Sequence, residues 1–151
     1  MVTVTFHAVT EVDDSLLKFA VIAARYQNQW VLCRHKARST WEIPGGHREP
    51  DEPIDAAARR ELWEETGAVD ASIEPVCIYN VRKDGTPSYG MLYFAEIFTL
   101  DSLPEGSEIG EIRLFETLPE NLTYPAIQPH LHRYILRWKA ADHLPTQDSD
   151  S

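Results

Sequence analysis

The stretch GHREPDEPIDAAARRELWEETGA, from Gly46 to Ala68, decides the fold of this chain. It follows the pattern G-x5-E-x7-R-E-U-x-E-E-x-G-U, where U is an apolar or small residue. The fixed positions are Gly46, Glu52, Arg60, Glu61, Glu64, Glu65 and Gly67. At a usage of roughly one in twenty per residue, seven such matches at one start arise by chance about once in a billion trials. The pattern is therefore a signal and not an accident of composition.

The same stretch predicts a helix from about Pro53 to Thr66. Pro53 supplies the fixed φ of a first helical residue, the alanines that follow are strong helix formers, and Gly67 is a natural C-terminal cap. Three glutamates stand at i, i+3 and i+4 on this helix: Glu61, Glu64 and Glu65. Their carboxylates share one face and repel each other unless a cation lies among them. Hard oxygen ligands suit Mg²⁺, or Mn²⁺ in its place.

An acidic helix face can simply be solvated, but three neighbouring features favour a metal site. Gly45 and Gly46 precede the helix and allow backbone carbonyls to approach a metal or a ligand closely. Arg60 adjoins the carboxylates and can hold one of them by a charge-assisted hydrogen bond. Glu52 lies at the mouth of the same helix. We therefore predict a metal site here rather than a solvated face.

The composition is that of one domain with an acidic surface. A chain of 151 residues fits a single domain, and its net charge of -10 disfavours nucleic-acid polymers and anionic membranes as partners. The same charge would repel a phosphate substrate unless bound divalent ions reverse the local field. Cys33 and Cys77 are too few for a disulfide framework, and we expect both to be small buried residues. The sequence has no signal peptide or apolar run of membrane-spanning length, so we expect a cytoplasmic protein.

The rest of the chain reads as strands separated by turns. Strands are expected at residues 3–9, 16–25, 30–35, 72–83, 89–100 and 112–115. Gln27-Asn28-Gln29 and Asp84-Gly85 have the composition of hairpin turns. A closing helix from residue 125 or 126 to residue 141 carries one apolar face. On it His130 and His132 stand two apart, cannot face one metal together, and are expected at the surface.

These elements predict an α/β (α+β) fold in which a mixed sheet is sandwiched between the central helix and the C-terminal helix. Residues 1–142 would form a single domain. Residues 143–151 lack apolar anchors and are expected to form a flexible tail.

The motif and the layout together resemble the Nudix family, from roughly Leu17 to about Trp138. The resemblance implies a hydrolase that cleaves a nucleoside diphosphate linked to another moiety X, through water attack at phosphorus. In such a site metal ions neutralise charge on the diphosphate and lower the pKa of a bound water. The resemblance implies the following metal ligands or supports: the Gly46 carbonyl, Glu52, Glu61, Glu64 and Glu65. It implies that Arg60 orients the carboxylates.

The resemblance leaves the general base open between two places. In some members the base lies in the signature helix, where Glu61 would be the candidate beside the carboxylate of Glu64. In others it lies further along the chain, where Glu108 and Glu111 fall in or beside a turn-like stretch before the last strand. An ordinary solvated charge is the alternative for either of these two residues.

The substrate contacts are assigned by position. Related nucleotide hydrolases place a phosphate-binding arginine at a strand end, so Arg34 is the first candidate, ahead of Lys36 and Arg38. Three residues of the approach to the helix complete the phosphate side: Gly45, Gly46 and His47. Gln128, at the head of the closing helix, could offer an amide to a base edge or could serve as a cap.

We therefore predict a Mg²⁺-dependent pyrophosphohydrolase that converts a nucleoside triphosphate, canonical or oxidised, to the monophosphate and pyrophosphate. Its partner is a small-molecule nucleotide, and the protein is a monomer or a homodimer. Hydrolysis of ADP-ribose or of a sugar nucleotide is one alternative, although Arg82 stands where ADP-ribose hydrolases carry a proline. A second alternative is a non-catalytic nucleotide-binding or regulatory module. Such modules typically lose signature glutamates, and this chain retains all of them.

Overall fold

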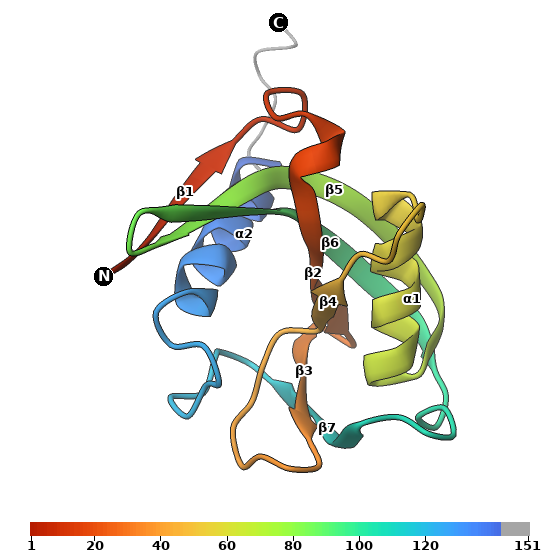
Figure 1. The fold of residues 1–151 in the computed structure, drawn as a ribbon. Helices are drawn as coiled ribbons and strands as arrows, with labels where there is room; N and C mark the ends of the chain where they lie inside the picture. Colours follow the sequence, from red (N-terminus) through yellow and green to blue (C-terminus); the bar gives the residue numbers. More distant parts are fainter. Residues whose placement is uncertain (143–151) are drawn as a thin grey trace, which may run out of the picture.

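Seven strands form one mixed sheet in the computed structural model, which describes residues 1–142 (Figure 1). The strands are β1 (Val2–His7), β2 (Leu17–Tyr26), β3 (Gln29–His35), β4 (Gly45–His47), β5 (Ala68–Lys83), β6 (Thr86–Leu100) and β7 (Ile109–Phe115). The helices are a short 3-10 turn η1 (Asp14–Leu16), α1 (Ile54–Thr66) and α2 (Gln128–Asp142). The predicted tail, residues 143–151, lies outside the described residues.

The strand order is β1-β5-β6-β2-β3-β7, and β4 pairs with β2 beside this path. Only the β2–β6 pair is parallel, and the other neighbours are antiparallel. Both predicted hairpins are present, and each turns through two residues with positive φ. These are Gln27 and Asn28, at 54° and 67°, and Asp84 and Gly85, at 52° and 86°. Two central residues of positive φ make the turn that matches the twist of paired strands.

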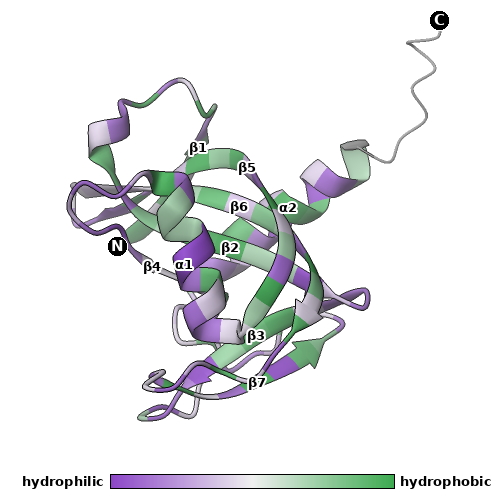
Figure 2. Ribbon diagram, turned by 90° about the vertical axis from the view of Figure 1, so that its right-hand side faces the viewer, coloured by the Kyte–Doolittle hydropathy of each residue, from purple (hydrophilic) through white to green (hydrophobic). Residues whose placement is uncertain are grey.

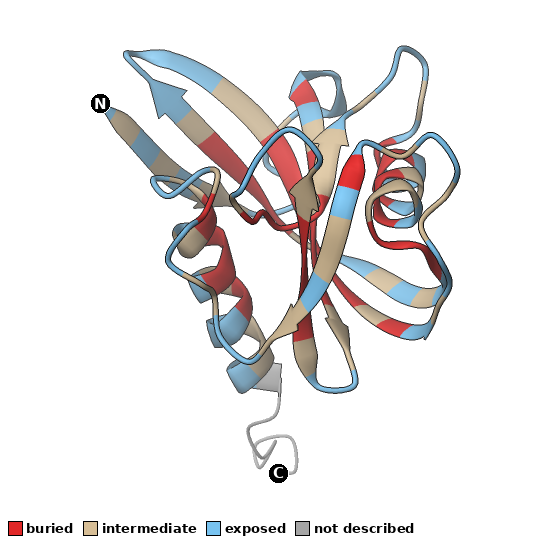
Figure 3. Ribbon diagram, turned by 90° about the horizontal axis from the view of Figure 1, so that it is seen from below, coloured by how far each residue is buried: buried red, intermediate tan, exposed pale blue. Residues whose placement is uncertain are grey.

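The sheet is covered on both faces, by α1 on one and α2 on the other, as the α/β (α+β) prediction requires (Figure 1). Successive residues of β2 illustrate the arrangement, because Ala20, Ile22 and Ala24 face the α1 side while Val21 and Ala23 face the α2 side. Burial on both faces explains why the central strands are almost continuously apolar. In Figure 2 the central strands are largely green, while α1 carries both green and purple residues. In Figure 3 the buried residues gather along the central strands and on the sheet side of both helices.

Helix α1 begins and ends close to the predicted boundaries. Pro53 occupies the N-cap position with extended φ and ψ, so the helix starts one residue later, at Ile54. Gly67 adopts a left-handed conformation with φ 81°, and its N–H donates to the Trp63 carbonyl. A glycine reaches this conformation without the steric cost that a Cβ would add. The motif's last fixed glycine therefore ends the helix that carries the glutamates.

Strand β2 pairs with different strands along its length. At its end β2 pairs with β3, through Arg25 and Tyr26. Further back it pairs with β4, and Ala20 lies opposite Gly46. The segment between β3 and β4 turns back along β3, where Cys33 and Glu42 form an isolated antiparallel bridge, before Gly45–His47 pair with β2.

Two sequence expectations need correction. The closing helix begins at Gln128, because residues 124–127 form a turn in which the Ile127 and Gln128 N–H groups donate to the Tyr124 carbonyl. His132 is buried, not a surface residue, with 7% of its surface exposed. Its ring packs edge-on against Trp30, with the two ring centroids 4.7 Å apart, because this tryptophan of β3 covers the flank of α2.

Cys33 and Cys77 are buried and free, as predicted. In residues 1–142 no helix is long and apolar enough to span a membrane.

Candidate active site

Arg60 is the centre of a network of carboxylates at the start of α1. Its guanidinium donates to both oxygens of Glu52, at 2.8 and 2.9 Å. Its Nη1 lies 3.1 Å from Glu61 Oε2 and 3.4 Å from Glu64 Oε1. Its Nη2 also donates to the His47 carbonyl at 3.0 Å, which ties β4 to the helix. The arginine therefore lies within hydrogen-bonding distance of three carboxylates, and its role in orienting them for a metal stays a prediction.

This network stabilises the negative charge of Glu52. The hydrogen bonds from Arg60, followed by that from the Glu49 N–H, lower the pKa of Glu52 to about 2. Both of its oxygens accept from Arg60 and one also accepts from the Glu49 N–H at 3.0 Å. Glu52 therefore anchors Arg60, and through it the neighbouring carboxylates.

Gly46 and Glu61 are in direct contact. A Cβ built on Gly46 would lie 2.5 Å from the Glu61 carboxyl carbon, so a larger residue here would displace the end of the Glu61 side chain. Glu61 is buried, and that burial raises the pKa of its carboxyl while the charge of Arg60 acts in the opposite direction. The backbone of β4 and the side chain of Glu61 thus lie together, and both carry oxygen atoms of the kind that bind a metal ion.

Glu65 lies deeper and connects α1 to the end of β3. Its Oε1 accepts from the Gly45 N–H at 3.0 Å and lies 3.7 Å from the Cys33 thiol. Burial raises the pKa of Glu65 to about 8, although the Gly45 N–H opposes the shift. His35 Nε2 stands 3.7 Å from Glu65 Oε2. Burial thus disfavours the charged form of the Glu65 carboxyl, and a cation bound nearby would stabilise that form.

His35 joins three carboxylates from three parts of the chain. Besides Glu65, its Nε2 lies 3.6 Å from Oε1 of the buried Glu42, and its Nδ1 lies 3.9 Å from Glu108 Oε1. The Lys36 N–H donates to the Glu108 carbonyl at 2.9 Å. The loop before β7 is also attached to α1, because Ser107 Oγ donates to the Glu64 carbonyl at 3.0 Å. These contacts bring residues 105–108 beside the carboxylates.

The carboxylates border a cavity of about 640 Å³, which we call the acidic cleft. It is lined by His35, Arg38, Glu42, Gly45, Gly46, His47, Glu49, Arg60, Glu61, Trp63, Glu64, Glu65, residues 104–109 and Tyr124. The cleft therefore gathers side chains from α1, from the 35–47 segment and from the loop before β7.

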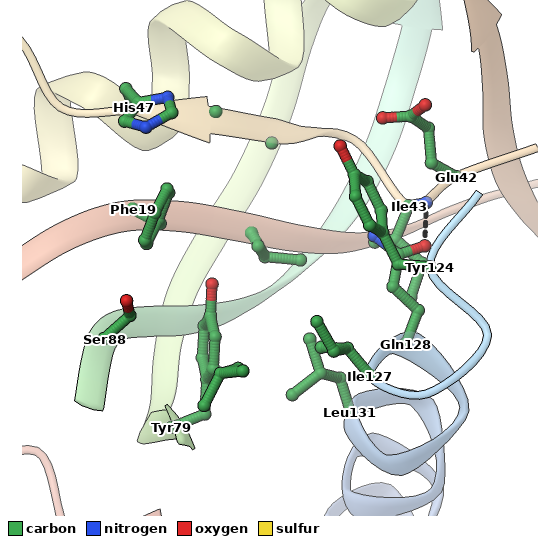
Figure 4. A pocket seen from close by; sticks show the side chains of 14 residues that line it. Phe19, Glu42, Ile43, His47, Tyr79, Ser88, Tyr124, Ile127, Gln128 and Leu131 are labelled. Carbon is green, nitrogen blue, oxygen red and sulfur yellow. Dashed lines mark hydrogen bonds between the residues drawn. The ribbon is translucent and has the colours of Figure 1, made fainter. Parts of the chain in front are cut away.

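A second cavity of about 280 Å³, which we call the apolar pocket, opens beside the cleft (Figure 4). It is lined by Phe19, Val21, Glu42, Ile43, Gly45, Gly46, His47, Tyr79, Val81, Ser88, Tyr124, Ile127, Gln128 and Leu131. Five residues line both cavities: Glu42, Gly45, Gly46, His47 and Tyr124. An aromatic, largely apolar pocket thus adjoins an acidic cleft.

Gln128 is fixed at the inner end of the apolar pocket. Its Oε1 accepts from the Ile43 N–H at 2.8 Å, which Figure 4 marks with a dashed line. The amide oxygen is engaged with the backbone of the segment that leads to Gly45 and Gly46. What Gln128 offers to a ligand is therefore its NH₂ group, a donor.

The structure separates the predicted site residues into two groups. Those that line the cleft or the pocket are Gly45, Gly46, His47, Glu61, Glu64, Glu65, Arg60, Glu108 and Gln128. Glu52 lines neither cavity and is held by Arg60. Arg34 and Glu111 also line neither cavity and face each other, with Arg34 Nη2 3.5 Å from Glu111 Oε1. Arg113 also binds Glu111, and this hydrogen bond lowers the pKa of the Glu111 carboxyl.

The sequence analysis did not identify Glu42, Glu49 or Trp63 as cleft residues, and it named Arg38 only behind Arg34. Glu42 directly precedes Ile43-Pro44-Gly45-Gly46, so its place before the glycine loop was the available signal. Trp63 occupies a variable position of the motif, and nothing in the spacing distinguishes it. Its side chain reaches the cleft with 45% of its surface exposed.

The donor set fits a hard divalent cation, since glutamate oxygens and a glycine carbonyl are the ligands that such ions prefer. Because Gly46 has no side chain, the β4 backbone is open toward Glu61. Within residues 1–142, however, no three histidine, cysteine, aspartate or glutamate side chains converge so as to hold one ion as they stand. Glu61 and Glu64 are turned toward Arg60 instead. An ion would therefore have to draw these two carboxylates away from the guanidinium.

Comparison with known proteins gives a consistent picture. The model of the NUDIX domain matches residues 16–139. A Bacillus subtilis protein provisionally named 8-oxo-dGTP diphosphatase YtkD is 36% identical over 106 residues, which cover 70% of this chain and 66% of that protein. A second B. subtilis protein, also provisionally named as an 8-oxo-dGTP diphosphatase, is 29% identical over 93 residues, covering 62% of this chain and 61% of its relative. The chain thus spans just under two thirds of the length of these curated relatives.

The fold is similar to a solved structure over almost its whole length. The crystal structure of a variant of the B. subtilis pyrophosphohydrolase BsRppH superposes with a TM-score of 0.74 and 28% sequence identity. The superposition covers 90% of this chain and 90% of that one.

Proposed function

Because the chain belongs to the Nudix hydrolase family, we propose that it is a Mg²⁺-dependent pyrophosphohydrolase of nucleoside triphosphates. Nudix hydrolases generally use divalent cations and act on small nucleotide substrates. In the proposed reaction the oxygen of water bonds to phosphorus and the bridging P–O bond between the α- and β-phosphates breaks. The products are the nucleoside monophosphate and pyrophosphate.

The observation that carries this proposal is that the apolar pocket adjoins the acidic cleft and shares five lining residues with it. A nucleotide has the same division, with a planar base at one end and a chain of anionic phosphates at the other. The base would enter between the aromatic side chains of the pocket, where stacking and burial favour it. The phosphates would pass Gly45 and Gly46 into the cleft.

The cation would be held by Glu61, Glu64 and Glu65 together with the Gly46 carbonyl. When bound, it would neutralise phosphate charge and make water more acidic. The hydrogen bonds between Arg60 and Glu52 join the segment before α1 to the middle of the helix, and they would remain when Glu61 and Glu64 turn from Arg60 to the ion. Gly46 keeps the backbone close to Glu61, and any side chain there would displace that carboxylate.

A carboxylate of the chain accepts the proton of the attacking water in this proposal. Glu61 remains a candidate from the signature helix. Among the later glutamates Glu108 is better suited than Glu111, because it lines the cleft and its side chain is 87% exposed. Glu111 is held by Arg113 and Arg34, and its lowered pKa makes it the weaker base.

The apolar pocket offers one polar contact to a base. Gln128 presents a hydrogen-bond donor there, because its oxygen is occupied by the Ile43 N–H. Such a donor matches a carbonyl oxygen or ring nitrogen on the base edge. The provisional names of the B. subtilis relatives make an oxidised purine, 8-oxo-dGTP, the first substrate to test.

The test is product analysis after incubation with Mg²⁺ and a panel of canonical and oxidised nucleoside triphosphates, ADP-ribose, sugar nucleotides and dinucleoside polyphosphates. We expect a monophosphate and pyrophosphate from one class of triphosphate. Cleavage of ADP-ribose or a sugar nucleotide alone would reject the triphosphate assignment. Binding of nucleotides without turnover of any of them would reject the hydrolase and favour a regulatory module.

A further inference from the structure

The acidic cleft is poorly suited to a polyanion without a cation of its own. It is lined by seven glutamates, Glu42, Glu49, Glu61, Glu64, Glu65, Glu105 and Glu108. Two arginines share this lining, Arg38 and Arg60, and arginine is always charged. Divalent ions can offset the signature glutamates, but the remaining carboxylates still face the phosphate path.

Arg60 has no donors to spare for a substrate. Its guanidinium is shared among Glu52, Glu61, Glu64 and the His47 carbonyl, and only 23% of its side chain is exposed. Arg38 is different, because 44% of its side chain is exposed and it has one carboxylate partner, Glu42, at 3.1 Å. It is therefore the arginine of the cleft with free N–H groups that reach solvent.

Arg38 is also held at a definite place, where the two cavities meet. Its Nη1 donates to Glu42 Oε2 at 3.1 Å, and both Glu42 and Tyr124 line the cleft and the apolar pocket. The loops that carry these residues are joined to each other. Thr40 Oγ1 and Thr123 Oγ1 lie 2.6 Å apart, and the Thr123 N–H donates to the Trp41 carbonyl at 2.9 Å. A side chain anchored in this way loses little conformational freedom when it binds.

Arg34 stabilises the backbone of the turn that carries Arg38. Its Nη1 donates to the Arg38 carbonyl at 3.1 Å and to the His35 carbonyl at 3.4 Å. The Arg38 N–H donates to the His35 carbonyl at 3.0 Å, which closes a tight turn over Arg34. The arginine at the strand end is therefore occupied with the backbone, and the arginine four residues later faces the cleft.

From this placement we infer that Arg38 binds phosphate oxygens of the nucleotide at the point where it passes from the apolar pocket into the acidic cleft. The inference rests on the proposed function for the identity of the ligand. The guanidinium fork matches two phosphate oxygens, while the hydrogen bond to Glu42 fixes its orientation. Arg38 thus selects nucleotides over nucleosides, and it takes the role that strand position alone would give to Arg34.

The test compares Arg38→Ala and Arg38→Lys with the intact protein and with a control, Arg82→Ala. Arg82 lies on the β5–β6 hairpin, outside both cavities, so the control removes the same charge without touching the cleft. Binding is measured by equilibrium dialysis with Mg²⁺ present, using two probes. One is the α,β-methylene analogue of dGTP, in which the bond to be cleaved carries no bridging oxygen, and the other is deoxyguanosine. Thermal unfolding is followed for every variant.

We expect Arg38→Ala to bind the analogue about 10- to 100-fold more weakly, the loss typical of a hydrogen bond to a charged group. Arg38→Lys keeps the charge but loses the fork, so its affinity should fall in between. Binding of deoxyguanosine and the unfolding temperature should match those of Arg82→Ala.

Unchanged binding of the analogue by Arg38→Ala would overturn the inference, and so would an equal loss for analogue and nucleoside. Because binding is measured with a probe that is not hydrolysed, the result is independent of turnover. An intact protein that binds the analogue through Arg38 but cleaves no nucleotide would leave this inference standing and reject the hydrolase. An intact protein that binds neither probe would reject both.

Discussion

At the scale of single residues, Arg60 shows how a short motif organises a site. One guanidinium holds Glu52 by two hydrogen bonds and lies within 3.4 Å of both Glu61 and Glu64. The like charges of these glutamates are tolerable because a permanent cation lies among them. The motif therefore contains its own counter-ion, which keeps the carboxylates close together before any metal arrives.

Replacing Glu64 with glutamine should lower turnover of the preferred nucleotide by at least about 100-fold, since removing a supporting group from a metal site already costs 10- to 100-fold. The side chain of Glu64 is 44% exposed, so the unfolding temperature should change little. The measurement is kcat with saturating Mg²⁺, and Glu74→Gln, an exposed glutamate of β5 outside the cleft, is the control. Near-normal kcat in Glu64→Gln would remove this residue from the site.

His132 should make the stability of the protein depend on pH. Burial, with the nearby cation of Arg25, lowers the pKa of His132 to about 4, and its Nε2 has no hydrogen-bond partner. An unfolded histidine takes up a proton near pH 6.5, whereas the folded one stays neutral until about pH 4. The contribution to stability is therefore complete above pH 6.5 and falls as the pH drops toward 4, by about 3 kcal/mol in all.

Urea unfolding between pH 7.5 and pH 4.5 checks this expectation. The free energy of unfolding should fall less steeply with acidification in His132→Leu than in the intact protein. His130→Leu, which removes an exposed histidine of the same helix, should retain the full slope. Identical slopes for all three proteins would show that His132 does not contribute.

At the scale of elements, two glycines with the same backbone conformation have different surroundings. Gly67 ends α1 with φ 81°, and a Cβ there would collide with the Asp101 carbonyl oxygen. Gly85 turns the β5–β6 hairpin with φ 86°, and a Cβ there would meet no atom within 4 Å. The first glycine is required by packing as well as by backbone conformation, and the second by conformation alone.

Replacing Gly67 and Gly85 with alanine should separate the cost of a left-handed backbone conformation from the cost of a steric clash. Gly85→Ala should lower the free energy of unfolding by about 1 kcal/mol, the cost of a left-handed residue with a Cβ. Gly67→Ala should lower it by more than about 2 kcal/mol, because the backbone of residue 101 must also move. Chemical denaturation measures both, and equal losses would contradict the steric account.

At the scale of the whole molecule, the candidate active site lies where the layers of the fold meet. The acidic cleft is bounded by α1 on one side of the sheet, and the apolar pocket by residues at the start of α2 on the other. Strand β2 joins them, because β4 pairs with it and presents Gly45 and Gly46 to both cavities. A ligand that fills both cavities would therefore hold both helices to the sheet.

Metal binding should be visible as added stability of the domain. Mg²⁺ at ten times its dissociation constant should raise the free energy of unfolding by about 1.4 kcal/mol, because the ion binds the folded carboxylates. EDTA should reverse the rise and abolish turnover. Thermal unfolding over a Mg²⁺ titration measures the effect, and Glu64→Gln should show a smaller rise than the intact protein. An equal rise in both would place the stabilising ion elsewhere.

Much of this architecture is determined by the sequence alone, because its signals are local. The helix with its glutamates depends on spacing, and its end on Gly67, so a motif read along the chain predicts both. The hairpin turns follow from Gln27-Asn28 and Asp84-Gly85, since a two-residue turn depends on its own φ angles. The near-continuous apolar strands indicate a sheet covered on both faces.

Only the tertiary structure decides which side chains outside the motif meet. Arg34 and Arg38 lie four residues apart and look alike in sequence, yet one supports a turn and the other faces the cleft. Glu108 and Glu111 are separated in the same way, because the pairing of β3 with β7 places Glu111 opposite Arg34. His132 is buried only because Trp30 packs against it from a distant strand. Contacts of this kind depend on long-range register, which residue spacing along the chain does not encode.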